Sequence, residues 1–490
     1  MQRVVAREFP VVQRLDAPFD RLAGAGILGS ILMAASSFWT GATPASFRTA
    51  PPALVSLLPR NSPVAVGGFW VGLVLSVGAW LLIGHQLLEG GSVSVRHLQV
   101  TGALWALPFV VALPLASRDV WAYAAQGHIA SGGANPYTVS PLDMYGPFSD
   151  NVSPKWQASY SPYGPLWTWL DRGVNDLTGP HITSTVLLLR VVSMAGLAML
   201  IWTVPVLAVR FGGRPGLALW AVVLNPLTVL HLVAGAHNDL LMIGLLSVAL
   251  YVATGAGRRW LVLVAAGALA AMAAAIKLPA IIAVAFLPLL WAYTRTSTAP
   301  ARSWRQVRAR LSELAGGIGL SAGAAAATLA VSTMLAGYGL SWLDNVNTSG
   351  HGGGAIGGIS IVAAAAAAWL LALRWPPAPM LAVALGAVVL ITPSALPWYW
   401  MWVFVVAGCV LTQRPAVVLL AAWSVALIAG IQPNGRSTHL RFELCLALAA
   451  IIAWAVLDRH WRPFATYRTR TQERPSEPVA GGSAGASART

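Results

Sequence analysis

The sequence predicts an all-α polytopic membrane protein, and three observations carry that prediction. Of its 490 residues, 57% are hydrophobic and only 10% are charged, and the mean hydropathy is +0.67. A soluble domain carries about 25% charged residues, so the composition excludes an ordinary soluble chain. Apolar runs of roughly 17 to 25 residues, each long enough to cross a bilayer, recur from Leu22 to Leu457.

These runs predict about 14 spans (13–14) between a cytoplasmic N-terminal segment, 1–21, and a basic, disordered cytoplasmic tail, 458–490. The transmembrane domain is therefore expected to cover residues 22–457. The spans are expected at 22–38, 64–88, 98–115, 184–208, 216–235, 240–256, 260–276, 279–294, 314–335, 356–373, 378–395, 398–412, 416–431 and 441–457.

Charge sets the orientation of these spans. The 31 Lys and Arg residues against 16 Asp and Glu residues give a net charge of +15. Alternating sides from a cytoplasmic N-terminus places 22 of those 31 cations inside, as the positive-inside rule requires. The basic excess is thus explained by topology in a plasma membrane, with both termini cytoplasmic, and no nucleic-acid partner is expected.

The longest outside segment, 116–183, contains Pro and Gly as well as two helical-looking stretches, Val120–Ser131 and Pro165–Val174. A loop of this length with structure of its own is usually functional. Asp119 lies beside Arg118 at its start, where a carboxylate is costly unless it is paired or used. An ion pair with Arg118 or a helix cap would also explain Asp119, but we favour a functional role.

A second outside cluster lies between two expected spans and consists of Asn225, His231, His237, Asn238 and Asp239. Asn238 or Asp239 could simply cap a helix. His237 with Asp239 is too small a ligand set to indicate a metal site. Further outside cations are Lys277, Arg436 and Arg441, and cations at this depth suit a membrane-bound phosphate, although Lys277 could also be a snorkelling loop residue.

Aromatic residues gather on the same side, in 116–183 and in the patch Leu396–Trp402. Such side chains either anchor helices at the membrane interface or stack on sugar rings. Nearly all candidate chemistry therefore faces away from the cytoplasm. A transporter should place polar groups near the midplane, and a channel should show rings of repeated ligands. A one-sided enzyme acting on a membrane-embedded substrate fits the pattern better.

Four motifs, RDVWAYAAQGHIASGGANPYTVSP, SPYGPLW, GAHNDLL and LPWYW, together resemble the polyprenol-phosphomannose-dependent α-1,6-mannosyltransferases of actinobacteria, which are GT-C glycosyltransferases. The resemblance covers the chain from about Gly24 to Leu457. It implies a GT-C fold with a large structured catalytic loop on the outside. It also implies inverting transfer of mannose from polyprenyl-phosphate-mannose to an α-1,6-mannan lipoglycan acceptor in lipomannan and lipoarabinomannan core synthesis. GT-C enzymes usually carry that loop after their first span, whereas Asp119 here follows the third expected span.

The resemblance also suggests roles for individual residues. Asp119 matches the acidic residue of the early outside loop and is expected to be the general base, with Asp239 as a reserve base or acceptor-orienting group. The donor phosphate is expected to bind Lys277, Arg436, Arg441 and His237. Sugar and acceptor contacts are expected from Arg118, Tyr123, Tyr163, Asn238, Trp398 and Tyr399.

The sequence contains no Asp-x-Asp pair, which nucleotide-sugar transferases commonly use to hold a metal on a diphosphate. We therefore expect neither a metal nor a cofactor. Three alternatives stay open: a GT-C transferase for another polyprenyl-phosphate sugar, such as arabinose or glucose, a flippase or transporter for a lipid-linked glycan, and a scaffold within a wall-building complex. The acceptor length, initiating or extending, is not encoded in any motif that the sequence shows.

Overall fold

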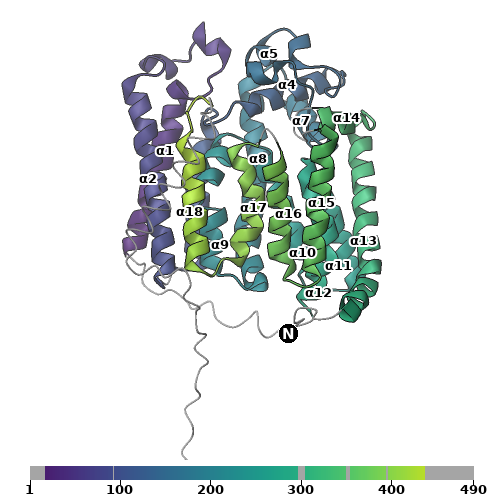
Figure 1. Cartoon of the computed structure of the whole chain (residues 1–490). Helices are drawn as coiled ribbons and strands as arrows, with labels where there is room; N and C mark the ends of the chain where they lie inside the picture. Colours follow the sequence, from purple (N-terminus) through teal and green to yellow (C-terminus); the bar gives the residue numbers. More distant parts are fainter. Residues whose placement is uncertain (1–16, 92, 296–303, 349–353, 393–394, 436–490) are drawn as a thin grey trace, which may run out of the picture.

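The computed structural model describes residues 17–91, 93–295, 304–348, 354–392 and 395–435. Within these ranges all regular elements are helical. Most helices run side by side in one bundle, and α4 (Asp119–Ser131), α5 (Pro147–Asp150) and α7 (Pro165–Thr178) lie over one end of it, at the top of Figure 1. The all-α prediction is confirmed for the described part of the chain.

The N-terminal helices pack as a close pair. A Cβ atom on Gly29 would lie 2.5 Å from the carbonyl oxygen of Gly72, so small residues let the two backbones approach. The elements are α1 (Ala17–Thr40), η1 (Ala45–Arg48), η2 (Val55–Leu57), α2 (Pro63–Leu88), α3 (Val95–Ala106) and η3 (Leu107–Val111). Helix α2 begins with Pro63, and the side chain of Ser62 caps it by accepting from the Ala65 amide.

The central helices form the middle of the bundle. They are α8 (Ile182–Phe211), α9 (Pro215–Val222), η5 (Leu227–Ala234), α10 (Asp239–Ala253) and α11 (Arg259–Ala274). Helices α8 and α10 cross at two glycines, since a Cβ on Gly244 would lie 2.4 Å from the Cα of Gly196. Helix α9 and the π-helix η5 meet at a 46° bend, which Pro226 explains because it has no backbone N–H to donate.

The remaining elements complete the bundle and the segments above it. They are η4 (Pro141–Asp143), α6 (Pro154–Gln157), η6 (Leu278–Ile281), α12 (Ile282–Tyr293), α13 (Trp304–Ala336), α14 (Ser341–Thr348), α15 (Gly354–Ala372), α16 (Pro377–Ile391), η7 (Pro397–Tyr399), α17 (Trp400–Ala407), η8 (Gly408–Val410) and α18 (Arg414–Ala429). Helices α4 and α7 coincide with the two helical stretches expected in 116–183.

Thirteen of the 14 expected spans fall on described helices, and the last, 441–457, lies outside the described residues. Four helices there are long and apolar enough to cross a membrane: Phe19–Thr40, Pro63–Leu88, Ile182–Phe211 and Leu314–Ala336. The bent pair α9 and η5 gives a fifth if it counts as one span, and the other apolar helices are 10 to 17 residues long. The structure therefore supports a multi-pass membrane protein, while the number of spans stays a prediction.

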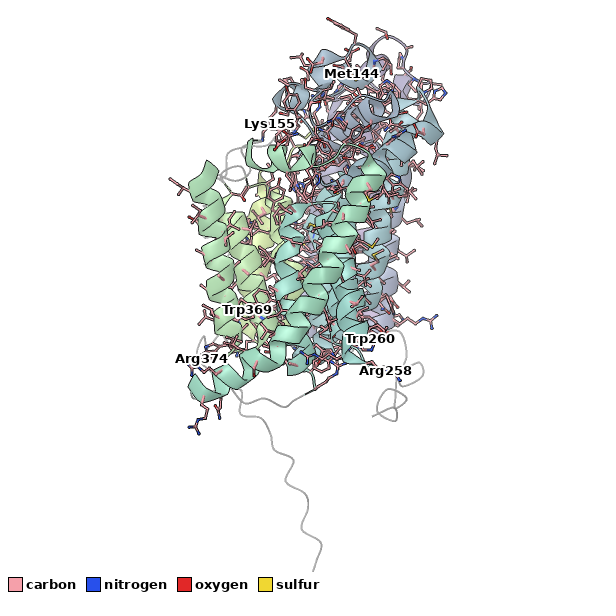
Figure 2. All side chains as sticks on the ribbon, turned by 90° about the vertical axis from the view of Figure 1, so that its right-hand side faces the viewer. Met144, Lys155, Arg258, Trp260, Trp369 and Arg374 are labelled. Carbon is pink, nitrogen blue, oxygen red and sulfur yellow. The ribbon has the colours of Figure 1, made fainter. Side chains whose placement is uncertain are left out.

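Residues labelled in Figure 2 mark the two ends of the bundle. Figure 2 shows Met144 and Lys155 at the end that carries α4, and Arg258 and Arg374 at the opposite end. The sequence predicts that Lys155 lies outside and that the two arginines lie on the cytoplasmic side. The residues that the sequence predicts to lie on opposite sides of the membrane, Lys155 and the two arginines, therefore lie at opposite ends of the bundle.

One buried arginine joins the loops that lead into the site. Arg190, fully buried in α8, donates to the carbonyl oxygen of Ala112 and, at 3.2 Å, to that of Ala234. The Leu115 amide donates to the same Ala234 carbonyl at 3.1 Å. Arg190 therefore connects the chain just before Asp119 with the end of η5.

Candidate active site

Asp119 is the first residue of α4, and the backbone just before it forms a sharp turn. Ala116 adopts a φ of 63°, and its amide donates to the Pro433 carbonyl at 3.1 Å. The Asp119 amide donates to the Ser117 hydroxyl at 3.1 Å, and Trp156 Nε1 donates to Asp119 Oδ1 at 3.0 Å. The carboxylate is thus fixed by one indole, and its second oxygen, Oδ2, makes no hydrogen bond within the described part of the chain.

The environment of Asp119 suits a base. Only 14% of its side-chain surface is exposed. Burial raises the pKa of the Asp119 carboxyl above its usual 3.8, while the hydrogen bond from Trp156 and the charges of Lys277 and Lys155 partly oppose that rise. A carboxylate with a raised pKa binds a proton more readily than an ordinary aspartate does.

His237, which belongs to the second predicted cluster, lies beside Asp119. Its Nδ1 is 3.9 Å from Asp119 Oδ2, too far for a hydrogen bond, and 3.2 Å from the Tyr123 hydroxyl. Its ring lies 4.0 Å from the ring of Trp398. The preceding residue, Ala236, has a φ of 55°, so the chain turns sharply to bring His237 toward α4.

Asp239 and Lys277 form a separate buried pair. The Lys277 ammonium lies 3.0 Å from both carboxylate oxygens of Asp239, and Trp402 Nε1 donates to Oδ1 at 2.7 Å. The ammonium also lies 4.3 Å from the centre of the Tyr399 ring and 5.9 Å from that of Tyr163. Asp239 is fully buried. Its carboxylate is therefore held by an ammonium and an indole.

The motif SPYGPLW positions one side of this pair. The Gly164 amide donates to the Ile276 carbonyl at 3.1 Å, and the Leu166 amide to the Ala275 carbonyl at 2.9 Å. A Cβ atom on Gly164 would lie only 2.3 Å from the Ala275 oxygen. The glycine thus permits a backbone contact that places the neighbouring Tyr163 beside Lys277.

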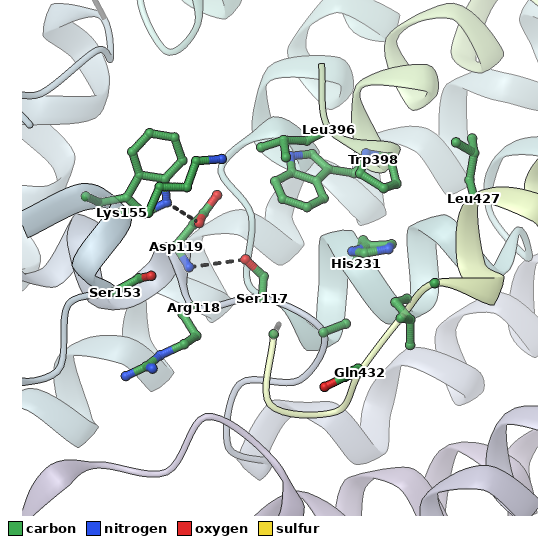
Figure 3. Close-up of a pocket in the computed structure, with 16 residues that line it drawn as sticks. Ser117, Arg118, Asp119, Ser153, Lys155, His231, Leu396, Trp398, Leu427 and Gln432 are labelled. Carbon is green, nitrogen blue, oxygen red and sulfur yellow. Dashed lines mark hydrogen bonds between the residues drawn. The ribbon is translucent and has the colours of Figure 1, made fainter. Parts of the chain in front are cut away.

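A pocket of about 80 Å³ opens next to Asp119. Its walls include Asp119, Lys155, Trp156, His231, Trp398 and Gln432. Figure 3 shows the Asp119 carboxylate and Lys155 on one side and His231 with Leu427 on the other. A carboxylate, a cation and an indole around one small cavity can bind a polar group of a substrate and remove a proton from it.

The predicted site residues separate into two groups. Asp119 and Arg118 line the pocket with Trp398, and Tyr123 and His237 lie next to it. Asp239, Lys277, Tyr163 and Tyr399 form the ion-pair group. Asn238 is buried, and neither atom of its amide has a hydrogen-bond partner in the described ranges. Arg436 and Arg441 lie outside the described residues.

The sequence did not reveal several residues of the site. Lys155 and Trp156 follow Asp119 by more than 30 positions. No helix or strand periodicity in the sequence links residues so far apart. His231 belongs to a predicted cluster, but the sequence suggests no role for it. Trp402 belongs to the aromatic patch Leu396–Trp402, and its contact with Asp239 spans 163 positions. Gln432 lies in the segment after α18, where nothing in the local pattern marks it.

No group of three or more His, Cys, Asp or Glu side chains that could hold a metal ion occurs among the residues with described positions. The polar side chains around the pocket are one carboxylate, one amide, one imidazole, two serine hydroxyls, two indoles and the cations Arg118 and Lys155. The cations suit a phosphate, and the amide, the imidazole and the serine hydroxyls suit the hydroxyl groups of a substrate.

Comparison with known proteins gives a consistent result. Residues 23–293 match the family model described as "Alpha-(1->6)-mannopyranosyltransferase, N-terminal domain", and residues 326–459 match "MptB C-terminal domain". The chain is 30% identical to alpha-(1->6)-mannopyranosyltransferase A of Mycobacterium tuberculosis, over 92% of this chain and 93% of the relative.

Two further relatives carry similar names. A probable alpha-(1->6)-mannopyranosyltransferase of Mycolicibacterium smegmatis is 29% identical, over 97% of this chain and 95% of its own length. Alpha-(1->6)-mannopyranosyltransferase A of Corynebacterium glutamicum is 34% identical, over 44% of this chain and 45% of the relative. No solved structure matches the chain.

Proposed function

The chain belongs to the alpha-(1->6)-mannopyranosyltransferase family, and from that membership we propose a specific reaction for this mannosyltransferase. It takes mannose from polyprenyl-phosphate-mannose and adds it, with inversion, to an α-1,6-mannan acceptor. The reaction takes place on the outer face of the plasma membrane and belongs to the synthesis of the lipomannan and lipoarabinomannan core.

The observation that carries the proposal is the position of Asp119. Its carboxylate lies in the wall of a pocket, oriented by Trp156, with a pKa above that of an ordinary aspartate. In an inverting transfer the acceptor hydroxyl attacks the anomeric carbon from the face opposite the phosphate. As the new C–O bond forms, the bond to the phosphate oxygen breaks, and Asp119 takes the hydroxyl proton. Polyprenyl phosphate leaves with the bonding electron pair.

The departing phosphate needs a cation. Lys155 lines the pocket with an exposed side chain, and its ammonium lies 4.5 Å from the centre of the Trp156 ring. Lys277, by contrast, is engaged by Asp239. We therefore place Lys155 near the leaving phosphate and give Lys277 a positioning role. His237, between Tyr123 and Asp119, is close enough to either substrate to contribute a hydrogen bond.

The outer-face assignment rests on the charge pattern of the sequence and on the arrangement of the helices. The pocket lies at the end of the bundle that carries Lys155, away from the arginines predicted to face the cytoplasm. A lipid-linked donor reaches such a pocket from the membrane plane, and no nucleotide is required outside the cell.

The test compares wild type with Asp119→Asn in isolated membranes, at matched expression. Each sample receives polyprenyl-phosphate-mannose and a short α-1,6-mannoside, and transfer of labelled mannose is followed. We expect a loss of about a hundredfold or more in the variant. Asp150→Asn is the matched control, because Asp150 is an exposed carboxylate of the same outside segment that does not line the pocket.

Equal transfer by Asp119→Asn and wild type would reject Asp119 as the base and leave the enzyme class intact. Absence of transfer by wild type would instead reject the donor. Polyprenyl-phosphate arabinose and glucose are then tried as donors in the same assay.

A further inference from the structure

His231 is a buried polar residue in the wall of the pocket. Its side chain is 2% exposed and lines the same cavity as Asp119. Neither of its ring nitrogens has a hydrogen-bond partner within the described part of the protein. Buried polar groups nearly always have partners. Where such a group borders a cavity, a molecule that fills the cavity can supply the missing partner.

Trp398 extends this surface. It is 6% exposed, its ring centre lies 5.2 Å from that of His231, and its Nε1 also lacks a partner among the residues described. Leu396 and Leu427 continue the same wall. We call the surface formed by His231, Leu396, Trp398 and Leu427 the inner wall. One face of the Trp398 indole is covered by the His237 ring, whose centre lies 4.0 Å away. The inner wall therefore offers the rest of the indole surface together with the imidazole of His231.

The backbone holds His231 firmly in this place. His231 belongs to η5, a π-helix, and π-helical turns often occur at functional sites. The start of η5 is fixed by Asn225, whose side chain accepts from the Leu227 amide at 2.9 Å and donates to Ser424 at 2.9 Å. A Cβ on Gly235 would lie 2.3 Å from the His231 oxygen, so a glycine is required after the helix. The imidazole is therefore preorganised without a ligand.

The two sides of the pocket differ in chemistry. Lys155 and Arg118 supply cations on the side of Asp119, and Arg118 also donates to the Asn151 carbonyl at 3.3 Å. The inner wall contains no lysine or arginine. A phosphate is attracted to the cationic side, whereas a sugar ring presents C–H groups that stack on an indole and hydroxyls that pair with imidazole nitrogens.

We propose that the inner wall is the subsite for the acceptor sugar, with His231 hydrogen-bonded to an acceptor hydroxyl and Trp398 stacked on its ring. This assignment rests on the proposed transfer reaction and adds to it the place where the acceptor binds. The bound acceptor lies between His231 and the Asp119 carboxylate, which faces the same cavity. His231 then sets the affinity for the acceptor and leaves the donor site unaffected.

The test uses the full-length protein in detergent and the variant His231→Leu, which keeps side-chain bulk and removes both nitrogens. We expect the KM for a short α-1,6-mannoside to rise about tenfold, the effect of losing one hydrogen bond to the substrate. The KM for the polyprenyl-phosphate-mannose donor stays within about twofold. The melting temperature without substrate should not fall, since two unpaired buried polar atoms are removed.

His181→Leu is the matched control, because His181 is an exposed histidine that precedes α8 and does not line the pocket. An unchanged acceptor KM in His231→Leu would overturn the proposal, and so would a rise confined to the donor KM. If His231→Leu fails to fold, Trp398→Phe, which removes Nε1 and narrows the aromatic face, is judged by the same two KM values.

Binding of α-1,6-mannobiose, followed by saturation-transfer NMR, separates this proposal from the proposed function. Binding by wild type that is lost in His231→Leu supports the inner wall as a sugar subsite, even if no donor is turned over. Transfer by wild type with unchanged mannobiose binding in His231→Leu keeps the reaction and rejects the subsite.

Discussion

The Lys277 ammonium lies 3.0 Å from each carboxylate oxygen of Asp239, and this pair is buried between the start of α10 and the end of α11. The sequence assigned the two residues to different tasks, one as a reserve base and the other as a phosphate ligand. Because they hold each other, we infer that their shared task is to position the neighbouring aromatic residues Tyr163 and Tyr399.

Breaking this pair should destabilise the fold strongly. Lys277→Met leaves a buried carboxylate without its cation, which costs about 3–5 kcal/mol. The double variant Lys277→Met with Asp239→Leu should lose less than Lys277→Met alone, because no unpaired charge remains. Thermal unfolding in detergent measures both. Glu89→Gln, which breaks the more exposed pair with Arg414, is the control and should cost about 1 kcal/mol or less.

The pH dependence of transfer should report Asp119. A base acts only in its ionised form, and burial raises the pKa of this carboxyl above 3.8. The value of kcat/KM should therefore fall on the acid side at a higher pH than for an ordinary aspartate. Trp156→Phe removes the hydrogen bond that lowers the pKa, so the fall should move to still higher pH. If kcat/KM of Trp156→Phe fell at the same pH as that of wild type, Asp119 would not be the group that titrates.

Gly435 should matter for activity through its backbone position. It has a φ of 77°, and a Cβ there would lie 2.7 Å from the Ser117 carbonyl carbon, next to the turn that presents Asp119. Gly435→Ala should reduce transfer by about tenfold or more, since small displacements of a catalytic group are costly. Gly133→Ala is the control: its φ of 82° gives the same strain, but no atom lies within 4 Å of the added Cβ. Equal losses in both variants would assign the effect to strain alone.

Metal removal should leave transfer unchanged. The sequence lacks an Asp-x-Asp pair, and a monophosphate donor can be neutralised by side-chain cations such as Lys155. We expect activity within about twofold of the untreated membranes after EDTA treatment, and no stimulation by Mg²⁺ or Mn²⁺. A loss on chelation that Mn²⁺ restores would show that a metal takes part.

The helices could be predicted from the sequence because each depends on a local apolar run. Runs such as 64–88 and 184–208 coincide with α2 and α8 within a few residues. The run 216–235 predicts one span but forms α9 and η5, because Pro226 interrupts the hydrogen bonding at a point that hydropathy does not register.

The candidate site was predictable only in part. Asp119 and His237 were found because polar residues stand out at the edges of apolar segments. The sequence does not reveal the partners of Asp119 and Asp239, because their contacts with Trp156 and Trp402 join residues 37 and 163 positions apart. A single sequence contains no local pattern for such pairs. The same limit hid the pairing of Lys277 with Asp239.

The buried Arg190 has a consequence for the order in which the chain is made. It lies about 12 Å along α8 from Ile182, and an arginine at such depth costs about 2.5–3.5 kcal/mol on insertion scales. When α8 leaves the ribosome, Ala112 has already been synthesised but Ala234 has not. The acceptors of Arg190 at Val110 and Ala112 precede α8 in the chain, whereas its acceptor at Ala234 becomes available only once η5 has been made. Newly made α8 is a point at which the translocon or a membrane chaperone would be expected to assist.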